Sequence, residues 1–415
     1  MSEPSRLRSR PLVALLTAEA VSSLGSQMTF LALPWFVLVT TGSAAKMSIV
    51  LAVELLPVAL LGIPSGALIS RLGARTTMVV GDAARAPLML AIPVLHEAGL
   101  LTFPLLLVFV FALGCFLAPY FSAQRLILPE LVGDDERTVA QANAVVEGTQ
   151  RATALLGPSL AGILIAVIGA TNVLYLDAAS YFASFLILTA FVPRRPPVAQ
   201  SEDARGLLAG IRFLVRDPFL RVLGLTALVL NMFGQMLVAS IPVLAFEEFD
   251  ESSTIAGLFF ASFGAGAVVG SVLALKLVPR YDPIRLGALS VVALTVPIPL
   301  LSLPLPAAAV IAVLFVSSVF GPLVNAPLIG VITMRTPEAL RPKVMTGVIT
   351  IALLAGPVGL LVVGPLLADW GPQTVLLCVG VGEFLATLPF AFVALRRDAL
   401  RADVPEVSPA AGVDH

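Results

Sequence analysis

The residues best suited to chemistry in this sequence are carboxylates that stand inside long apolar segments. Glu54, Asp177 and Glu383 each interrupt such a segment, and Glu383 has no basic residue within one helical turn. An ionisable group in an apolar segment is expensive to bury, so it marks a functional site by default. Burial disfavours the charged form of a carboxylate, which would let these side chains take up and release protons near neutral pH. Reversible protonation is therefore the chemistry that this pattern indicates.

Further charged positions in apolar segments allow a structural interpretation beside the functional one. Glu19 lies about two turns into the first segment, where it either takes part in proton transfer or extends to the inner surface. Glu147 and Arg151 are four residues apart, so they share a helix face and can pair. Their pair is either a structural ion pair that faces a cavity or a direct contact to a ligand. Asp177 is likewise either packed near a helix end or part of a proton relay.

Uncharged polar side chains also fall within apolar segments, at Asn231, Gln235 and Asn325. Amides in such positions either hydrogen-bond a bound molecule or connect neighbouring helices. The two histidines and the two cysteines form no metal-ligand, disulfide or nucleophile–base pattern. We therefore expect no metal site, no catalytic residue, no enzyme activity and no cofactor. The expected energy source is a proton gradient.

The amino-acid composition indicates whether the chain folds in water or in a lipid bilayer. The chain has 415 residues, of which 58% are hydrophobic and 12% charged, and its mean hydropathy is +1.00. Soluble domains are roughly 45–50% apolar and about 25% charged, so this chain fits a lipid bilayer better than water. The formal net charge of −1 gives no reason to expect a nucleic acid partner.

Twelve apolar runs are long enough to cross a bilayer as helices, which takes about 20 residues each. They lie near 12–41, 45–69, 77–97, 100–122, 139–168, 171–192, 219–247, 254–277, 285–303, 306–333, 344–368 and 373–395. If both termini are cytoplasmic, 22 of the 25 basic residues fall on the inner side, as the positive-inside rule requires. We therefore predict a multi-pass membrane protein with both termini in the cytoplasm.

The spans divide into two groups of six that repeat each other. Gln27-Met28 with Pro34 and Gln235-Met236 with Pro242 are related by an offset of 208, and Gly157-Pro158 and Gly356-Pro357 by 199. Matched pairs that link each span to the sixth span after it indicate two homologous halves, an architecture typical of secondary transporters. The predicted division is 1–192, a linker at 193–218 that contains an amphipathic surface helix, 219–397 and a tail at 398–415. A partly ordered linker is the alternative for 193–218.

The loop that follows the second span is similar to a known signature. "GALISRLGAR" resembles the loop between helices 2 and 3 of the major facilitator superfamily, where Gly66, Leu68, Arg71, Gly73 and Arg75 match. Ser70 stands where the family usually has an aspartate. In that family the aspartate is implied to latch the two halves when the cavity faces outward, and serine cannot hold its charge. The latch is then either weaker here or supplied with a carboxylate by the third span, where Asp82 is the candidate.

Other segments resemble bacterial drug:proton antiporters related to macrolide efflux proteins. "GDAAR", which contains Asp82 and Arg85, is similar to the start of helix 3 in that group. Gly157, Pro158 and Gly162 match the antiporter motif of helix 5, in which Ala161 replaces a glycine. The resemblance implies twelve helices in two pseudo-symmetric bundles and an all-α integral membrane fold. It also implies proton-driven export of an amphipathic small molecule by a monomer through rocker-switch alternating access. An importer or uniporter of a small organic solute with the same fold remains the alternative.

Overall fold

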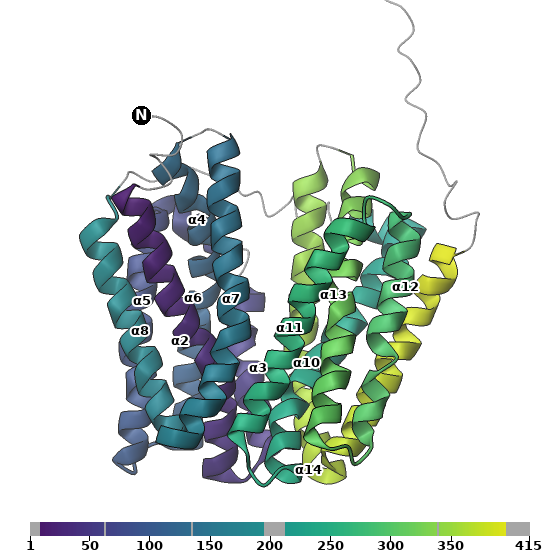
Figure 1. The fold of residues 1–415 in the computed structure, drawn as a ribbon. Helices are drawn as coiled ribbons and strands as arrows, with labels where there is room; N and C mark the ends of the chain where they lie inside the picture. The colour runs from purple at the N-terminus through teal and green to yellow at the C-terminus, as the bar shows by residue number, and fades with distance from the viewer. Residues whose placement is uncertain (1–8, 62–63, 134–135, 195–211, 338–339, 396–415) are drawn as a thin grey trace, which may run out of the picture.

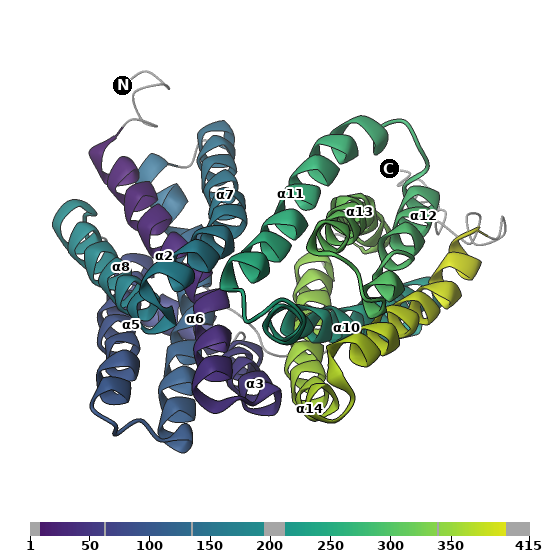
Figure 2. The same ribbon diagram turned by 60° about the horizontal axis from the view of Figure 1, so that its bottom comes forward.

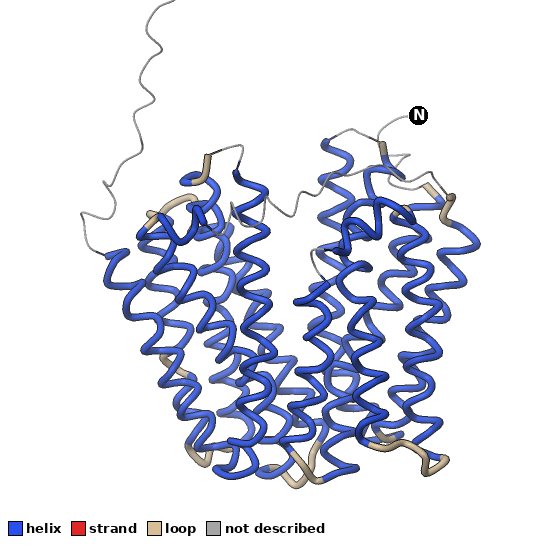
Figure 3. Tube along the Cα trace, turned by 180° about the vertical axis from the view of Figure 1, so that it is seen from behind, coloured by secondary structure: helices blue, strands red, loops and turns tan. Residues whose placement is uncertain are grey.

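A computed structural model describes residues 9–61, 64–133, 136–194, 212–337 and 340–395. Within these ranges every regular element is a helix, and only short loops join the helix ends (Figure 3). The helices form two bundles that stand side by side, one from each half of the chain (Figure 1). The predicted all-α integral membrane fold with two bundles is confirmed.

The first bundle holds seven helical segments and the second holds the remainder. The first contains α2 (Arg10–Thr41), α3 (Ala44–Leu61), α4 (Pro64–Leu72), α5 (Ala74–Glu97), α6 (Phe103–Val132), α7 (Glu136–Ile168) and α8 (Ala170–Phe191). The second contains α10 (Pro218–Glu248), α11 (Ser253–Leu277), α12 (Pro283–Thr295), the 3-10 helix η1 (Ile298–Ser302), α13 (Ala307–Arg335) and α14 (Arg341–Leu395). Of the predicted linker at 193–218, residues 193–194 and 212–218 lie within the described ranges, and 212–216 are helical. The first part of its predicted amphipathic helix lies outside these ranges.

Eleven of the described helical segments are long and apolar enough to cross a bilayer. One of them, α14, contains Gly371 at φ 75°, a conformation that interrupts a right-handed helix. The two parts of α14 on either side of Gly371 correspond to the predicted spans 344–368 and 373–395. Counted separately, these parts bring the number of spans to the predicted twelve.

The ninth predicted span, 285–303, differs from a simple helix. It consists of α12 and η1, with Pro297 between them. Proline has no N–H to donate and crowds the preceding turn, so Pro297 and Pro299 end the α-helix and favour the tighter 3-10 turn. The combined segment Pro283–Ser302 is still long and apolar enough to cross a bilayer, so it counts as one span of the second half.

The residues that repeat along the sequence make corresponding contacts within the two halves. An added Cβ on Gly157 of α7 would lie 2.3 Å from Cβ of Gln27 on α2, and one on Gly356 of α14 would lie 3.3 Å from Cγ of Gln235 on α10. The glutamines and glycines that repeat along the sequence therefore also meet each other in space. Small residues at these crossings let the helix backbones approach closely in lipid.

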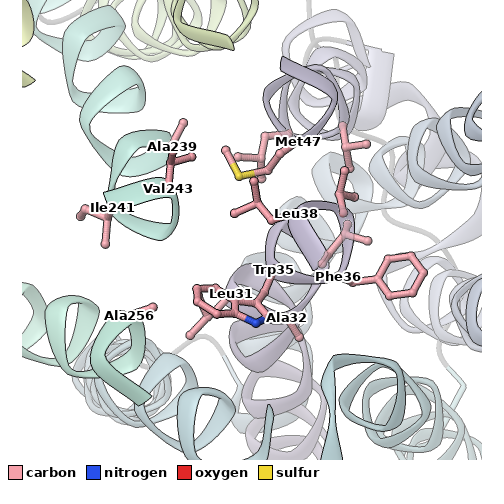
Figure 4. Packing of buried hydrophobic residues seen from close by; sticks show 14 of the residues in the cluster. Leu31, Ala32, Trp35, Phe36, Leu38, Met47, Ala239, Ile241, Val243 and Ala256 are labelled. Atoms are coloured by element: carbon pink, nitrogen blue, oxygen red, sulfur yellow. The ribbon is translucent and has the colours of Figure 1, made fainter. Parts of the chain in front are cut away.

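The bundles contact each other near one end and diverge towards the end where α2 begins and α14 ends (Figure 1). One buried apolar cluster joins both halves, whereas a second is confined to the first half and a third to the second half. At the joined end, α3 lies beside α14 and α7 beside α11 (Figure 2). Ala239 and Val243 of α10 point toward Leu38 of α2 and Met47 of α3 across this junction, and Ala256 of α11 lies on the side of Leu31 (Figure 4).

Candidate functional site

A cavity of about 930 Å³ lies within the second bundle and is the candidate binding site. Its walls come from α10, α11, α12, η1, α13 and α14, with one residue, Arg151, contributed by α7 of the first bundle. Most of the lining is aliphatic or aromatic. The cavity brings together five residues that sequence analysis selected, namely Arg151, Asn231, Gln235, Asn325 and Glu383.

Glu383 is the only carboxylate among the residues that line this cavity. Its side chain is 3% exposed, and its Oε2 atom has no hydrogen-bond partner among the described residues. The neighbouring Gly382 packs against the ring of Phe233 on α10, which fixes how this face of α14 meets the bundle. A buried carboxylate without a partner is costly unless it is protonated or meets a cation.

Arg151 does not neutralise Glu383, because it already has other partners. Its Nη2 atom lies 2.9 Å from Oε1 of Glu147, and its Nη1 atom donates to Oγ of Ser271 on α11 over 3.1 Å. The Glu147 and Arg151 side chains are 57% and 53% exposed, respectively. The pair therefore lies at the open edge of the cavity, and its hydrogen bond to Ser271 links the two bundles.

Asp177 occupies a different environment, in the interior of the first bundle. It is fully buried and accepts hydrogen bonds from Thr29 Oγ1 over 2.6 Å and from Ser180 Oγ over 3.1 Å. An added Cβ on Gly25 of α2 would lie 2.5 Å from Asp177 Oδ1, so this position must be glycine for the carboxylate to fit. Glu54 of α3 is half-buried and within electrostatic reach of Asp177.

Asp82 and Arg85 form a buried ion pair between α5 and α8. The guanidinium donates to Asp82, and Ser184 of α8 donates to the other carboxylate oxygen over 2.6 Å. The rings of Tyr120 and Tyr181 cover the guanidinium on two sides, with their centroids 4.2 and 4.4 Å from its central carbon. Asp82 therefore faces the interior of its own bundle, and its described contacts do not include the other bundle.

Glu19 of α2 lies in the same interior, where Gln150 connects it to Gln124. Gln150 Nε2 donates to Glu19 Oε1 over 3.5 Å and to Gln124 Oε1 over 3.2 Å. Glu19 is 3% exposed and Gln124 2% exposed. The carboxylate therefore does not reach the membrane surface but ends among buried polar groups.

The loop that resembles the family signature forms a helix followed by a turn. Gly66, Ser70 and Arg71 belong to α4, and Gly73 has φ 82°, a left-handed conformation that favours glycine. Arg75 at the start of α5 donates from Nε to the carbonyl of Val192 over 2.6 Å and from Nη2 to that of Thr189 over 2.9 Å. Arg75 thereby satisfies carbonyl groups at the end of α8, which have no partner within their helix.

The segment that resembles the antiporter motif packs in two directions. Gly157 contacts α2, as described above, while Gly162 contacts α11 of the other bundle. An added Cβ on Gly162 would lie 2.6 Å from the carbonyl oxygen of Ser253, and Ser253 Oγ donates to the Gly162 carbonyl over 3.1 Å. Gly257 likewise approaches the carbonyl of Pro158. These small residues form much of the junction between the bundles.

Sequence analysis missed several residues of the first bundle's interior, among them Ser22, Thr29, Gln124, Gln150 and Tyr181. These are small or uncharged residues that hardly change the hydropathy of a span. A signal was nevertheless present, since Glu19, Ser22, Ser26 and Thr29 recur at the spacing of one helix face. Testing each span for a polar face would have found this set.

The fold and the cavity together define a membrane transporter built from two related helical bundles. The model of the Major Facilitator Superfamily matches residues 15–346. The chain belongs to this superfamily, which confirms the resemblance read from its motifs.

Comparisons with individual proteins agree with this assignment. The chain is 28% identical over 408 residues to the multidrug efflux pump Tap of Mycolicibacterium fortuitum, covering 95% of this chain and 98% of that protein. It is 26% identical over 416 residues to Tap of Mycobacterium tuberculosis, covering 97% of each. Among solved structures, the nucleoside transporter NupG superposes with a TM-score of 0.75 at 13% identity, covering 92% of this chain and 99% of that chain. This last likeness concerns the fold alone.

Proposed function

We propose that this protein is a secondary active transporter that exports amphipathic organic molecules in exchange for protons. The observation that carries the proposal is the apolar cavity of about 930 Å³ whose one carboxylate, Glu383, has no cationic partner among the described residues. The similarity to two pumps named for multidrug efflux supports the direction and the breadth of substrates.

The lining of the cavity favours a molecule with an apolar body. Aliphatic and aromatic side chains such as Phe263, Leu275 and Val291 form most of the wall, and desolvation of apolar surface is the main source of affinity in such pockets. Asn231, Gln235 and Asn325 can each donate or accept a hydrogen bond. They would orient a polar substituent without fixing a single substrate, which suits an exporter of varied compounds.

The charge of the cavity favours a ligand with one positive charge or none. Arg151 is occupied by Glu147 and Ser271, so the unneutralised charge of the cavity belongs to Glu383. A cation would neutralise the carboxylate directly, whereas a neutral ligand would bind when Glu383 carries a proton. Competition between a proton and a cationic ligand at one carboxylate would couple their movements in opposite directions.

The arrangement of the bundles supports alternating access. By the distribution of basic residues, the end at which α2 begins and α14 ends is the cytoplasmic end. The bundles diverge there and meet at the opposite end (Figure 1), so this conformation is open to the cytoplasm. Tilting the bundles about the cavity would expose it to the outside instead. We place the monomeric transporter in the bacterial cell membrane with both termini inside, divided at 1–192, 193–218, 219–397 and 398–415.

The test uses purified protein in liposomes, with ethidium as a lipophilic monovalent cation. An imposed pH gradient should drive ethidium against its concentration gradient, and a protonophore should abolish this accumulation. Glu383→Gln should weaken ethidium binding at least about tenfold, because a close charge–charge contact in a buried site contributes more than about 1.4 kcal/mol. Glu248→Gln, at an exposed position at the end of α10, is the matched control and should bind as the wild type does.

Three results would contradict the proposal. Ethidium that only equilibrates across the membrane, whatever the pH gradient, would indicate a uniporter of the same fold, and accumulation in the direction of proton movement would indicate an importer. Unchanged ethidium affinity in Glu383→Gln would remove this carboxylate from the binding site.

A further inference from the structure

The interior of the first bundle contains a row of buried and half-buried polar side chains that do not line the substrate cavity. We propose that this row forms a path, a water-filled proton relay that joins Glu19 to Asp177 and Glu54. The inference rests on the proposed proton exchange and assigns its two cargoes to different bundles, the proton to the first and the organic substrate to the second.

One face of α2 forms the backbone of the path. Glu19, Ser22, Ser26 and Thr29 follow one another at intervals of three or four residues, which places them on the same side of the helix. Glu19, Ser22 and Thr29 are 3–4% exposed and Ser26 is half-buried, so this face points into the bundle. At about 1.5 Å per residue, the path runs for about 15 Å, close to half of the hydrocarbon thickness.

Polar groups from the other helices line the same path. Ser26 Oγ lies 2.9 Å from Tyr181 Oη, and Thr29 donates to Asp177. Tyr181 in turn covers Arg85, the partner of Asp82. The buried titratable and charged groups of this interior are Glu19 of α2, Asp82 and Arg85 of α5, Tyr120 of α6, and Asp177 and Tyr181 of α8. Glu54 of α3 is half-buried and within electrostatic reach of Asp177.

The charges along this path do not balance. It contains four carboxyl groups, those of Glu19, Glu54, Asp82 and Asp177, whereas Arg85 is the only buried lysine or arginine in the described part of the chain. Asp82 takes the guanidinium as its partner. Several unpaired carboxylates within a membrane bundle are too costly to stay ionised together. The remaining three carboxyl groups must therefore share protons, which makes the path a store from which protons can leave and to which they can return.

Unsatisfied polar atoms indicate water along the path. Glu19 Oε2, Gln124 Nε2 and Arg85 Nε are buried and have no hydrogen-bond partner within the described ranges. Buried polar groups in native proteins are nearly always satisfied, and internal water supplies the missing partners where several such groups converge. Gln124 and Tyr120 are four residues apart on α6 and share a helix face. Tyr120 Oη also has no hydrogen-bond partner within the described ranges, and its ring lies against Arg85, so these unsatisfied groups gather in one region.

The proposed step moves a proton without any other change of bonding. A proton that enters from the outside binds to a carboxylate oxygen of Glu54 or Asp177. Each hydroxyl or water of the path then accepts one proton and gives another to its neighbour, and Glu19 releases a proton to the cytoplasmic side. One O–H bond forms for each that breaks, and the carboxylate of Glu54 or Asp177 is regenerated.

The test compares driven transport with exchange in liposomes, using ethidium as the probe and pyranine inside to report protons. Glu19→Gln and Gln124→Met should lower both pH-driven ethidium accumulation and ethidium-dependent proton movement about tenfold or more, because a proton-transfer group is lost. Exchange of ethidium for ethidium needs no net proton movement, so these variants should keep it, together with ethidium affinity. Ser159→Ala is the matched control, since Ser159 is half-buried on α7 and donates only to a carbonyl of its own helix.

The outcomes separate the two proposals. If the wild type shows no pH-driven accumulation, the proposed function fails and the relay fails with it. If protons drive ethidium accumulation by the wild type, and both variants accumulate ethidium as Ser159→Ala does, only the proposed relay is wrong. Parallel loss of affinity, exchange and driven transport in the variants would also overturn it, because the residues would then be structural parts of the whole protein.

Discussion

Each bundle carries one acid in its last span, but the two acids lie in different surroundings. Gly169 and Gly371, both with positive φ, precede these spans and relate them by an offset of 202, so Glu383 corresponds to Tyr181 and lies about one turn beyond the equivalent of Asp177. Asp177 is held by Thr29 and Ser180 in a closed interior, whereas Glu383 faces an open cavity and keeps one oxygen without a partner in the described structure. The residues around each carboxylate decide whether it is enclosed or available.

The residues opposite each acid account for this difference. Gly25 of α2 leaves room for Asp177, while the equivalent Phe233 of α10, 208 residues later, packs on Gly382. Thr29 donates to Asp177, while the equivalent Leu237 is apolar and lines the cavity. One bundle therefore supplies hydrogen bonds to its acid, and the other supplies apolar surface for a ligand. The two halves of a duplicated transporter can therefore keep one fold while they place different side chains around their acids.

The largest expected effect comes from filling the space that Gly25 leaves. Gly25→Val should destabilise the protein by up to about 3 kcal/mol, because the new side chain would overlap Asp177 and Ser180 in a close-packed interior. Thermal unfolding of the purified protein in detergent measures this. Gly148→Val on α7 is the control, since an added Cβ there meets nothing within 4 Å. Equal melting temperatures for the two variants would contradict the enclosed environment of Asp177.

A smaller effect is expected from removing one donor to the enclosed acid. Thr29→Val keeps the shape of the side chain but leaves an Asp177 oxygen without its 2.6 Å hydrogen bond, which should cost about 1–3 kcal/mol. Thr295→Val in the second bundle is the comparison, because Thr295 is equally buried and donates only to carbonyls of its own helix. In the same unfolding measurement, the melting temperature of Thr29→Val should be well below that of Thr295→Val. The reverse order would mean that Asp177 does not depend on this donor.

The spans could be predicted from the sequence because lipid dictates their length and composition. Every predicted run overlaps a described helix, and the main departures occur where backbone chemistry matters more than hydropathy. Pro297 breaks the ninth span into two kinds of helix, and α6 continues to Val132, beyond the predicted end at 122. Neither event changes the mean hydropathy of a window enough to be seen.

The candidate site could be predicted only in part. Glu383 and Asp177 stood out because a charge in an apolar run is conspicuous. Which acid faces a cavity depends on the rotation of each helix about its axis and on packing partners far away in the sequence, such as Phe233 for Gly382. The hydroxyl groups that donate to Asp177 belong to serine and threonine, which hardly change the hydropathy of a span and so do not stand out in the sequence. Their role follows from the fold and not from their type.

The smallest effect on stability is expected at the link between the bundles. Arg151→Gln should change the free energy of unfolding by less than about 1 kcal/mol, because its pair with Glu147 is more than half exposed and screened by water. A deeply buried pair would behave differently, and the single variant would then be much less stable than the double variant Glu147→Gln/Arg151→Gln. Unfolding of both variants measures this difference. A large gap between them would mean that the bundles close around the pair, so that this edge of the cavity is part of the enclosed interior instead of its entrance.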